Sequence, residues 1–199
     1  MLPRSPGRAA AGAVIGPPAI ESVISAPGLV NVPQYSLSWS APANSESFVL
    51  EESANGGGWT VMHNGAANSF GASRGKGSYA YRVRACNFVG CSPYSGVVTV
   101  AVVLPPGATS LNVAEWLTTR RPPYQVQCSA GWIAVADATE YQLESGGDGK
   151  RLYTGPSIYV NSGGSAYCAN EYRVRACNAG GCSPWSAERP VTRGVLSWD

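Results

Sequence analysis

Six cysteines are the residues of this chain whose types and spacing most clearly suggest chemistry. Four of them form two pairs with one spacing, Cys86 with Cys91 and Cys177 with Cys182. Such pairs can form a disulfide, a thiol redox site or a zinc site. Four residues separate the members of each pair, whereas a thioredoxin-like redox site has only two between them. The spacing suits cysteines that face each other across a hairpin, so it predicts a disulfide in each pair.

A zinc ion bound by all four cysteines is the alternative, and it requires both pairs to meet at one point. Each pair belongs to a separate copy of an internal repeat, and equivalent loops of tandem modules lie a domain length apart. This disfavours zinc. The remaining cysteines, Cys128 and Cys168, occur only in the second copy. Because disulfides in a small, loop-rich chain indicate an oxidising compartment, we expect an extracellular, cell-surface or periplasmic protein.

No catalytic constellation accompanies the cysteines. The single histidine, His63, lies in a predicted turn over residues 63–66, and no nucleophile with an orienting partner is present. Acids on the third strand of each copy could serve a glycosidase only if one were held in a desolvated cleft. These acids are Glu51, Glu52, Glu140 and Glu144. The glycine-rich segments lack the Gly-Lys-Ser/Thr of a phosphate cradle. The sequence therefore predicts neither enzyme activity nor a bound cofactor.

The composition indicates short strands joined by turns. There are 24 glycines and 15 prolines among 199 residues, with 44% hydrophobic and 13% charged residues. The net charge of +2 gives no indication of nucleic-acid binding. The longest apolar run, residues 97–104, is too short to span a bilayer. Residues 1–16 are expected to form a flexible arm, whose short and interrupted apolar stretch does not predict a secretory signal.

An internal repeat organises the rest of the chain. The segment that runs from Tyr81 to Ser95 returns from Tyr172 to Ser186, an offset of 91 residues (172 minus 81), and the copies differ at only three positions. Upstream of it, tryptophan precedes the next aromatic by nine residues in both copies. A repeat of this length is a domain duplication. Because proline has no amide hydrogen to give a sheet, the strand before Pro105 and Pro106 must end there.

Alternating apolar and polar residues predict seven strands in each copy, separated by glycine-rich turns. In the first copy the predicted strands are 19–25, 34–40, 47–53, 58–63, 68–72, 79–86 and 94–103. In the second copy they are 109–116, 124–134, 140–145, 150–154, 157–161, 171–177 and 185–193. The predicted fold is all-β, with two tandem seven-stranded Greek-key β-sandwiches.

The pattern Tyr-x-Tyr-Arg-Val-Arg-Ala-x-Asn-x-x-Gly-x-Ser-x-x-Ser of the first copy resembles the sixth and seventh strands of fibronectin type III domains. Trp39 and Trp132 resemble that family's core tryptophan on the second strand. The version with cysteines is similar to modules of large bacterial surface and secreted proteins, including Rhs-type repeat proteins and multi-modular polysaccharide hydrolases. The resemblance implies fibronectin type III-like, immunoglobulin-like domains at 17–104 and 105–194, followed by a C-terminal tail at 195–199.

The resemblance also carries expectations for individual residues. Tyr79 matches the family's corner tyrosine, whose hydroxyl bonds back to the backbone, whereas the second copy has Asn170 at that position. In a sandwich of this topology Cys128 and Cys168 lie at the same end on opposite sheets. A third disulfide between them is predicted, and two buried free thiols are the alternative.

A candidate binding surface combines arginines on the outer face of the sixth strand with an aromatic residue after each hairpin. Its residues are Arg82, Arg84, Tyr94, Arg173, Arg175 and Trp185. In the competing interpretation the arginines pair with acids on neighbouring strands and the aromatics pack at the sandwich edge.

We expect a non-catalytic spacer or structural module of an extracellular or cell-surface protein, because sandwiches joined by a short Pro-Pro linker make a semi-rigid rod. The alternative is a module that recognises protein or carbohydrate through the stapled loops and the arginine-aromatic face. Expected partners are other domains of a longer chain, a protein or a polysaccharide ligand. We expect a monomer that neither binds nucleic acid nor inserts into a membrane.

Overall fold

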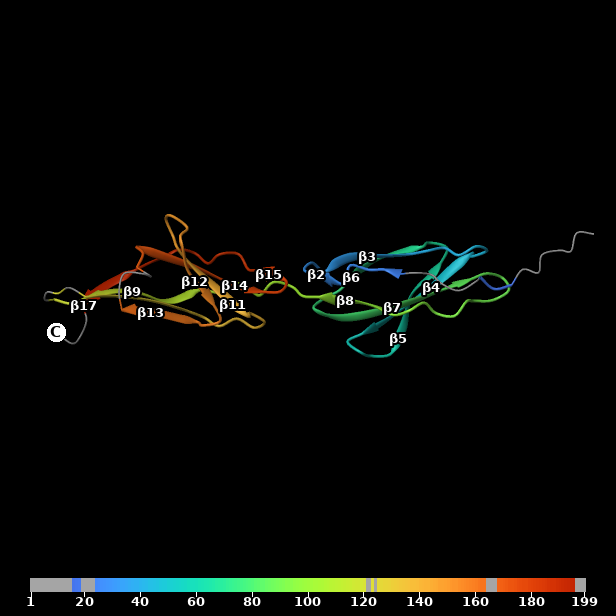
Figure 1. Cartoon of the computed structure of the whole chain (residues 1–199), viewed down its shortest axis with the longest axis horizontal. Coiled ribbons are helices and arrows are strands. Elements are labelled where there is room, and N and C mark those ends of the chain that lie inside the picture. Colours follow the sequence, from blue (N-terminus) through green and yellow to red (C-terminus); the bar gives the residue numbers. More distant parts are fainter. Residues whose placement is uncertain (1–15, 19–23, 121–122, 124, 164–167, 196–199) are drawn as a thin grey trace, which may run out of the picture. The chain divides into compact units, whose positions relative to one another are not determined.

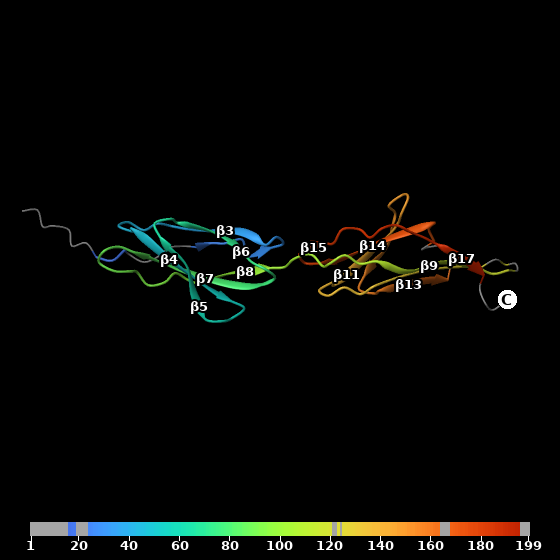
Figure 2. The same cartoon turned by 180° about the vertical axis from the view of Figure 1, so that it is seen from behind.

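The computed structural model describes residues 16–18, 24–120, 123, 125–163 and 168–195. All regular elements among these residues are β-strands, and they form two compact units whose main-chain division falls between Ala101 and Val102 (Figures 1 and 2). The predicted domain boundaries stay a prediction. Among the described residues there is no helix that is long and apolar enough to cross a membrane.

Two sheets build the first unit. One has the order β1-β3-β6, with β1 at Ile24–Ser25, β3 at Gln34–Trp39 and β6 at Ser69–Ser73. The other has the order β2-β8-β7-β4-β5. Its strands are β2 (Leu29–Val30), β4 (Ser47–Ala54), β5 (Trp59–Gly65), β7 (Gly77–Cys86) and β8 (Val98–Val102).

The second unit repeats this plan with one difference at its last strand. One sheet has the order β13-β10-β9-β17, and the other β12-β11-β14-β15 with β16 also paired to β14. The first comprises β9 (Leu111–Thr118), β10 (Val126–Trp132), β13 (Tyr159–Gly163) and β17 (Thr192–Val195). The second comprises β11 (Glu140–Ser145), β12 (Arg151–Gly155), β14 (Glu171–Asn178), β15 (Gly181–Cys182) and β16 (Arg189–Pro190). Strand β17 runs parallel to β9, so the end of this unit contributes to both sheets.

Each unit is closed around its own tryptophan. Strand β3 alternates exposed and buried side chains along its length, which places Trp39 in the core. The Trp39 ring lies edge-on to Phe48 of the opposite sheet, with 6.0 Å between ring centroids. In the second unit Trp132 lies 5.8 Å from Tyr141, and both are buried. The expectation of an all-β sandwich fold is confirmed.

The predicted seventh strands, 94–103 and 185–193, begin too early. Residues 92–97 form no strand, and regular pairing starts at Val98 in the first unit and at Arg189 in the second. Serine hydroxyls take over half of the pairing: the Ser92 Oγ accepts a hydrogen bond from the Ala85 amide and the Ser95 Oγ one from the Val83 amide, while the two serine amides still donate to the carbonyls of Ala85 and Val83. The two serines are three positions apart, whereas the two β7 amides from which they accept are two positions apart. In a regular strand pair the two spacings would be equal.

Three further differences concern the first unit. The turn predicted at residues 63–66 is wrong, because β5 continues to Gly65 and His63 lies on it opposite Leu50. The short strand β2 was not predicted. Of the predicted strand 19–25, residues 19–23 lie outside the described residues, and 24–25 form β1.

Candidate functional site

In the first unit, the predicted surface residues assemble around one tyrosine. Arg82 and Arg84 lie on the outer face of β7, as predicted from the alternation, and their side chains are half-buried. The Tyr94 ring covers both guanidinium groups, with centroid distances of 4.2 Å to Arg82 and 4.8 Å to Arg84. Arg82 also lies 4.1 Å from the ring centroid of Trp59 on β5. We call these four residues the Tyr94 stack.

The second unit forms the corresponding Trp185 stack, made of Trp185 and three arginines. The guanidinium carbons of Arg175, Arg173 and Arg151 lie 4.4, 5.1 and 5.4 Å from the indole. Arg173 and Arg175 project from β14, whereas Arg151 comes from β12. Guanidinium groups over an indole face are attracted by its quadrupole. Sequence reasoning missed Trp59 and Arg151, because each belongs to another strand.

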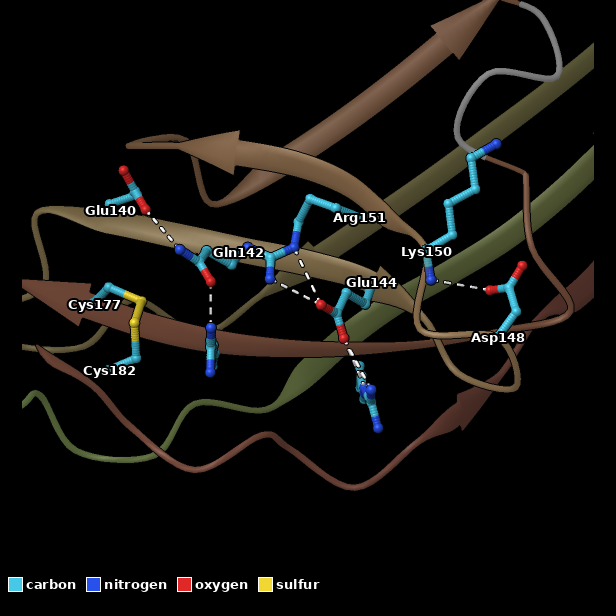
Figure 3. Close-up of polar contacts among 10 residues, drawn as sticks. Glu140, Gln142, Glu144, Asp148, Lys150, Arg151, Cys177 and Cys182 are labelled. Atoms are coloured by element: carbon cyan, nitrogen blue, oxygen red, sulfur yellow. Dashed lines mark hydrogen bonds and ion pairs between the residues drawn. A yellow bond between two sulfur atoms is a disulfide. The ribbon is translucent and has the colours of Figure 1, made fainter.

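Acids on the third strand of each unit neutralise part of these stacks. Glu51 accepts a hydrogen bond from Arg82 at 2.8 Å. Glu144 binds Arg151 with one carboxylate oxygen and Arg173 with the other, at 2.8 and 2.9 Å (Figure 3). Arg175 instead donates to Gln142, which in turn donates to Glu140. Of the four acids considered for glycosidase chemistry, Glu51 and Glu144 therefore serve as counter-ions on this face.

The Glu144 carboxylate is held in its charged form. Burial alone would raise its pKa, but hydrogen bonds from Arg173 and Arg151 outweigh burial and hold the pKa below the ordinary value. In the first unit, the hydrogen bond from the Tyr94 hydroxyl is the main cause that lowers the pKa of Glu51. Each acid is therefore negatively charged at neutral pH and compensates part of the positive charge of the stacked arginines.

Acid should destabilise the second unit through Glu144. Its ordinary pKa is 4.5. Because the pKa is lower in the folded state, the stabilisation is complete above this pH and is lost as the pH falls through the folded pKa. Glu144→Gln should remove this share of the acid sensitivity, which urea unfolding from about pH 7 to about pH 3 would measure. Glu140→Gln, on the same strand, is the matched control, and an unchanged pH profile for Glu144→Gln would contradict this assignment.

Each of the six cysteines lies in a disulfide. Cys86 bonds to Cys91 and Cys177 to Cys182, each across a hairpin with Cα atoms 4.0 Å apart. A third disulfide closes a loop with a sequence separation of 40. Its partners are Cys128 and Cys168. With every sulfur so bonded, none of these side chains is a thiolate that could bind zinc in this state.

The position of Cys128 is occupied in the first unit by Tyr35, which belongs to a buried polar network. The Tyr35 and Tyr81 hydroxyls are 2.6 Å apart, and the Tyr81 hydroxyl donates to Glu52 at 2.5 Å. Arg74 donates to the same carboxylate oxygen at 2.7 Å. Burial is the main cause that raises the pKa of Tyr35 and of Tyr81. The two hydroxyls therefore stay protonated and able to donate.

Expectations from the sequence also concern the corner position, Tyr79 in the first unit and Asn170 in the second, and His63. The Tyr79 hydroxyl donates to the Gly75 carbonyl oxygen at 3.0 Å, the bond expected for a corner tyrosine. In the second unit, Asn170 instead accepts a hydrogen bond from Arg193. The half-buried His63 packs against Trp39 at 5.8 Å between ring centroids. It is therefore neither a turn residue nor placed beside a nucleophile.

Comparison with known proteins adds the following. No protein-family model matches the chain, and no curated protein sequence matches it. Among solved structures, the chain is similar to the crystal structure of the FN1-FN3 domains of chicken contactin (CNTN1), with a TM-score of 0.43 and 15% sequence identity. The match covers 89% of this chain and 66% of that one, so the chain spans slightly less than two thirds of the length of that structure. A likeness with a TM-score this low carries no argument about this chain. The fold class is an all-β protein built of β-sandwiches.

Proposed function

We propose that this chain is a non-catalytic spacer, a tandem pair of β-sandwich modules in an extracellular, cell-surface or periplasmic protein. Three disulfides that use all six cysteines support the oxidising compartment. A small domain stapled in this way resists unfolding, because each disulfide constrains the unfolded chain. Resistance of this kind is the main requirement of a spacer.

The observation that carries the spacer role is the internal neutralisation of the most strongly charged face. Both oxygens of Glu144 are used by Arg151 and Arg173, and these arginines are covered by Trp185. A binding site keeps donors free for its ligand, because a ligand must replace the hydrogen bonds that it displaces. Here Arg151 and Arg173 each already use two guanidinium nitrogens on Glu144. The stack therefore braces β11, β12 and β14 against one another.

Recognition of a protein or carbohydrate is the second candidate, and one observation favours it. Arg84 Nε is buried and has no hydrogen-bond partner among the described residues, although the guanidinium is stacked on Tyr94. A carboxylate or sulfate of a ligand could accept from the guanidinium. Phe88 nearby in sequence is 73% exposed, an apolar group of the kind that interfaces cover.

A glycan array and a pull-down with the oxidised protein test the two functions against each other. The spacer role predicts that both give no ligand. Recognition predicts a ligand whose affinity falls about tenfold or more in Arg84→Ala, as expected when a charged hydrogen bond is lost. Arg193→Ala is the matched control, because Arg193 also stacks on an aromatic ring, the indole of Trp116, but lies on β17, which pairs with β9 and not with the arginine-bearing strands. A ligand lost equally in both variants would place the binding elsewhere.

A further inference from the structure

Each stapled hairpin contacts the segment that leads into its own unit. We call residues 86–91 and 177–182 the stapled hairpins, and residues 16–18 and 104–106 the lead-in segments. Both lead-in segments end in Pro-Pro, and in both the first proline is exposed and the second buried. The side-chain Nδ2 of Asn87 donates to the Gly16 carbonyl oxygen at 3.0 Å, and that of Asn178 donates to the Leu104 carbonyl oxygen at 3.0 Å. The same bond therefore occurs in both copies.

Both the oxygen and the nitrogen of the asparagine side chain form hydrogen bonds. In the second hairpin the Asn178 Oδ1 accepts from the Gly180 amide at 2.7 Å, so it shapes the turn. Its Nδ2 donates to Leu104 and also to the carbonyl oxygen of Asp137, at 3.2 Å. An aspartate could shape the same turn but has no hydrogen to donate. Asparagine is therefore required by the contact with the lead-in segment and not by the turn.

Glycines in the hairpins complete the contact. A Cβ placed at Gly181 would lie 3.6 Å from the ring of Pro105, and one at Gly90 would lie 3.8 Å from Pro17, so each hairpin lies against the first proline. A Cβ at Gly180 would lie 1.9 Å from the Val103 carbonyl oxygen, far inside van der Waals contact. Any side chain at position 180 would clash with this carbonyl group, so only glycine fits there.

We propose that the stapled hairpin is a clamp that holds an X-Pro-Pro lead-in segment. The asparagine provides the hydrogen bond, the glycine provides the surface for the first proline, and the disulfide keeps the hairpin in the shape that presents both. The two copies differ at position 180, where glycine leaves room for the Val103 carbonyl oxygen, whereas the first copy has Val89 at the equivalent position. This inference concerns each unit by itself and would stand if the chain proved to be a recognition module.

Backbone NMR relaxation on the oxidised protein tests the clamp. In the native protein the amides of Gly16 and Leu104 should have order parameters near about 0.85, the value of rigid backbone. Asn178→Asp should lower that of Leu104 towards the flexible range below about 0.6 and leave Gly16 unchanged, and Asn87→Asp should do the reverse. Each variant thus serves as the folding control for the other unit. Unchanged order parameters in both variants would overturn the proposal.

Two further variants separate the roles of the glycine and the disulfide. Gly180→Val should loosen Leu104, whereas Ala179→Phe, the other change towards the first hairpin, should not. The pair Cys177→Ser with Cys182→Ser should loosen Leu104 partly, because the turn loses its covalent tie. A rigid Leu104 in Gly180→Val would contradict the role of the close backbone contact. A rigid Leu104 without the disulfide would contradict the role of the staple.

Discussion

Replacing Cys128 and Cys168 together by alanine should lower the free energy of unfolding of the second unit by about 4 kcal/mol. Their disulfide closes a loop with a sequence separation of 40, and in the chain-entropy model a loop of this length contributes about 4 kcal/mol. It also joins β10 of one sheet to Cys168, three positions before the start of β14 of the other. Urea unfolding followed at the NMR signal of Val174, with that of Val83 as the reference for the first unit, would measure the loss.

The matched control removes a stapled-hairpin disulfide instead. Cys86 and Cys91 have a sequence separation of 5, for which the same model gives only about 2 kcal/mol. Alanine at both positions should therefore destabilise the first unit by about half as much as the longer loop destabilises the second. Equal losses would contradict the loop-length argument and would indicate that local packing around the sulfurs determines the stability.

Glu52→Ala should destabilise the first unit by about 3 kcal/mol. The buried Glu52 carboxylate accepts from Arg74 and Tyr81, and removing one member of a buried pair leaves the other charge without a partner. The Tyr81 hydroxyl, which is also buried, would retain only its bond to Tyr35. Urea unfolding at neutral pH, read at Val83, is the measurement.

Glu51→Ala is the control for this substitution, because Glu51 is the neighbouring acid and pairs with Arg82 on the outer face. Exposed or half-exposed ion pairs contribute about 1 kcal/mol or less. If Glu51→Ala costs as much as Glu52→Ala, burial does not distinguish the two carboxylates and the network has no special role. The loss of unfolding free energy in Glu52→Gln should lie between those of the two alanine variants. Glutamine keeps an acceptor for Tyr81 but removes the charge opposite Arg74.

The two units thus close one end of the same fold with different chemistry. Tyr35 and Cys128 occupy equivalent places on their strands, and each bridges to the opposite sheet. The first unit uses a hydroxyl and carboxylate network, and the second uses a covalent bond. The network depends on the protonated hydroxyls of Tyr35 and Tyr81, whereas the disulfide depends on an oxidising environment. Their responses to pH and to reductants should therefore differ in the two units.

The features that could be predicted are those encoded in neighbouring residues. Alternation of apolar and polar side chains identified the buried face of β7 and the outward direction of Arg82 and Arg84. A spacing of five placed the hairpin cysteines opposite each other. The seventh strand was placed too early for a related reason. Its serines read as strand residues, and nothing in the local pattern shows that their hydroxyls accept from backbone amides of β7.

The sequence by itself determined the all-β sandwich fold, its tryptophan cores and its hairpin disulfides, because periodicity and short spacings act within one strand or turn. Only the tertiary structure decided which side chains from different strands meet. Trp59 reaches Arg82, and Arg151 reaches Glu144, through strand pairings that contain a bulge after Leu50 and after Leu143. A shift of one residue in such a register turns every side chain to the opposite face, and residues far apart in the chain set that register together.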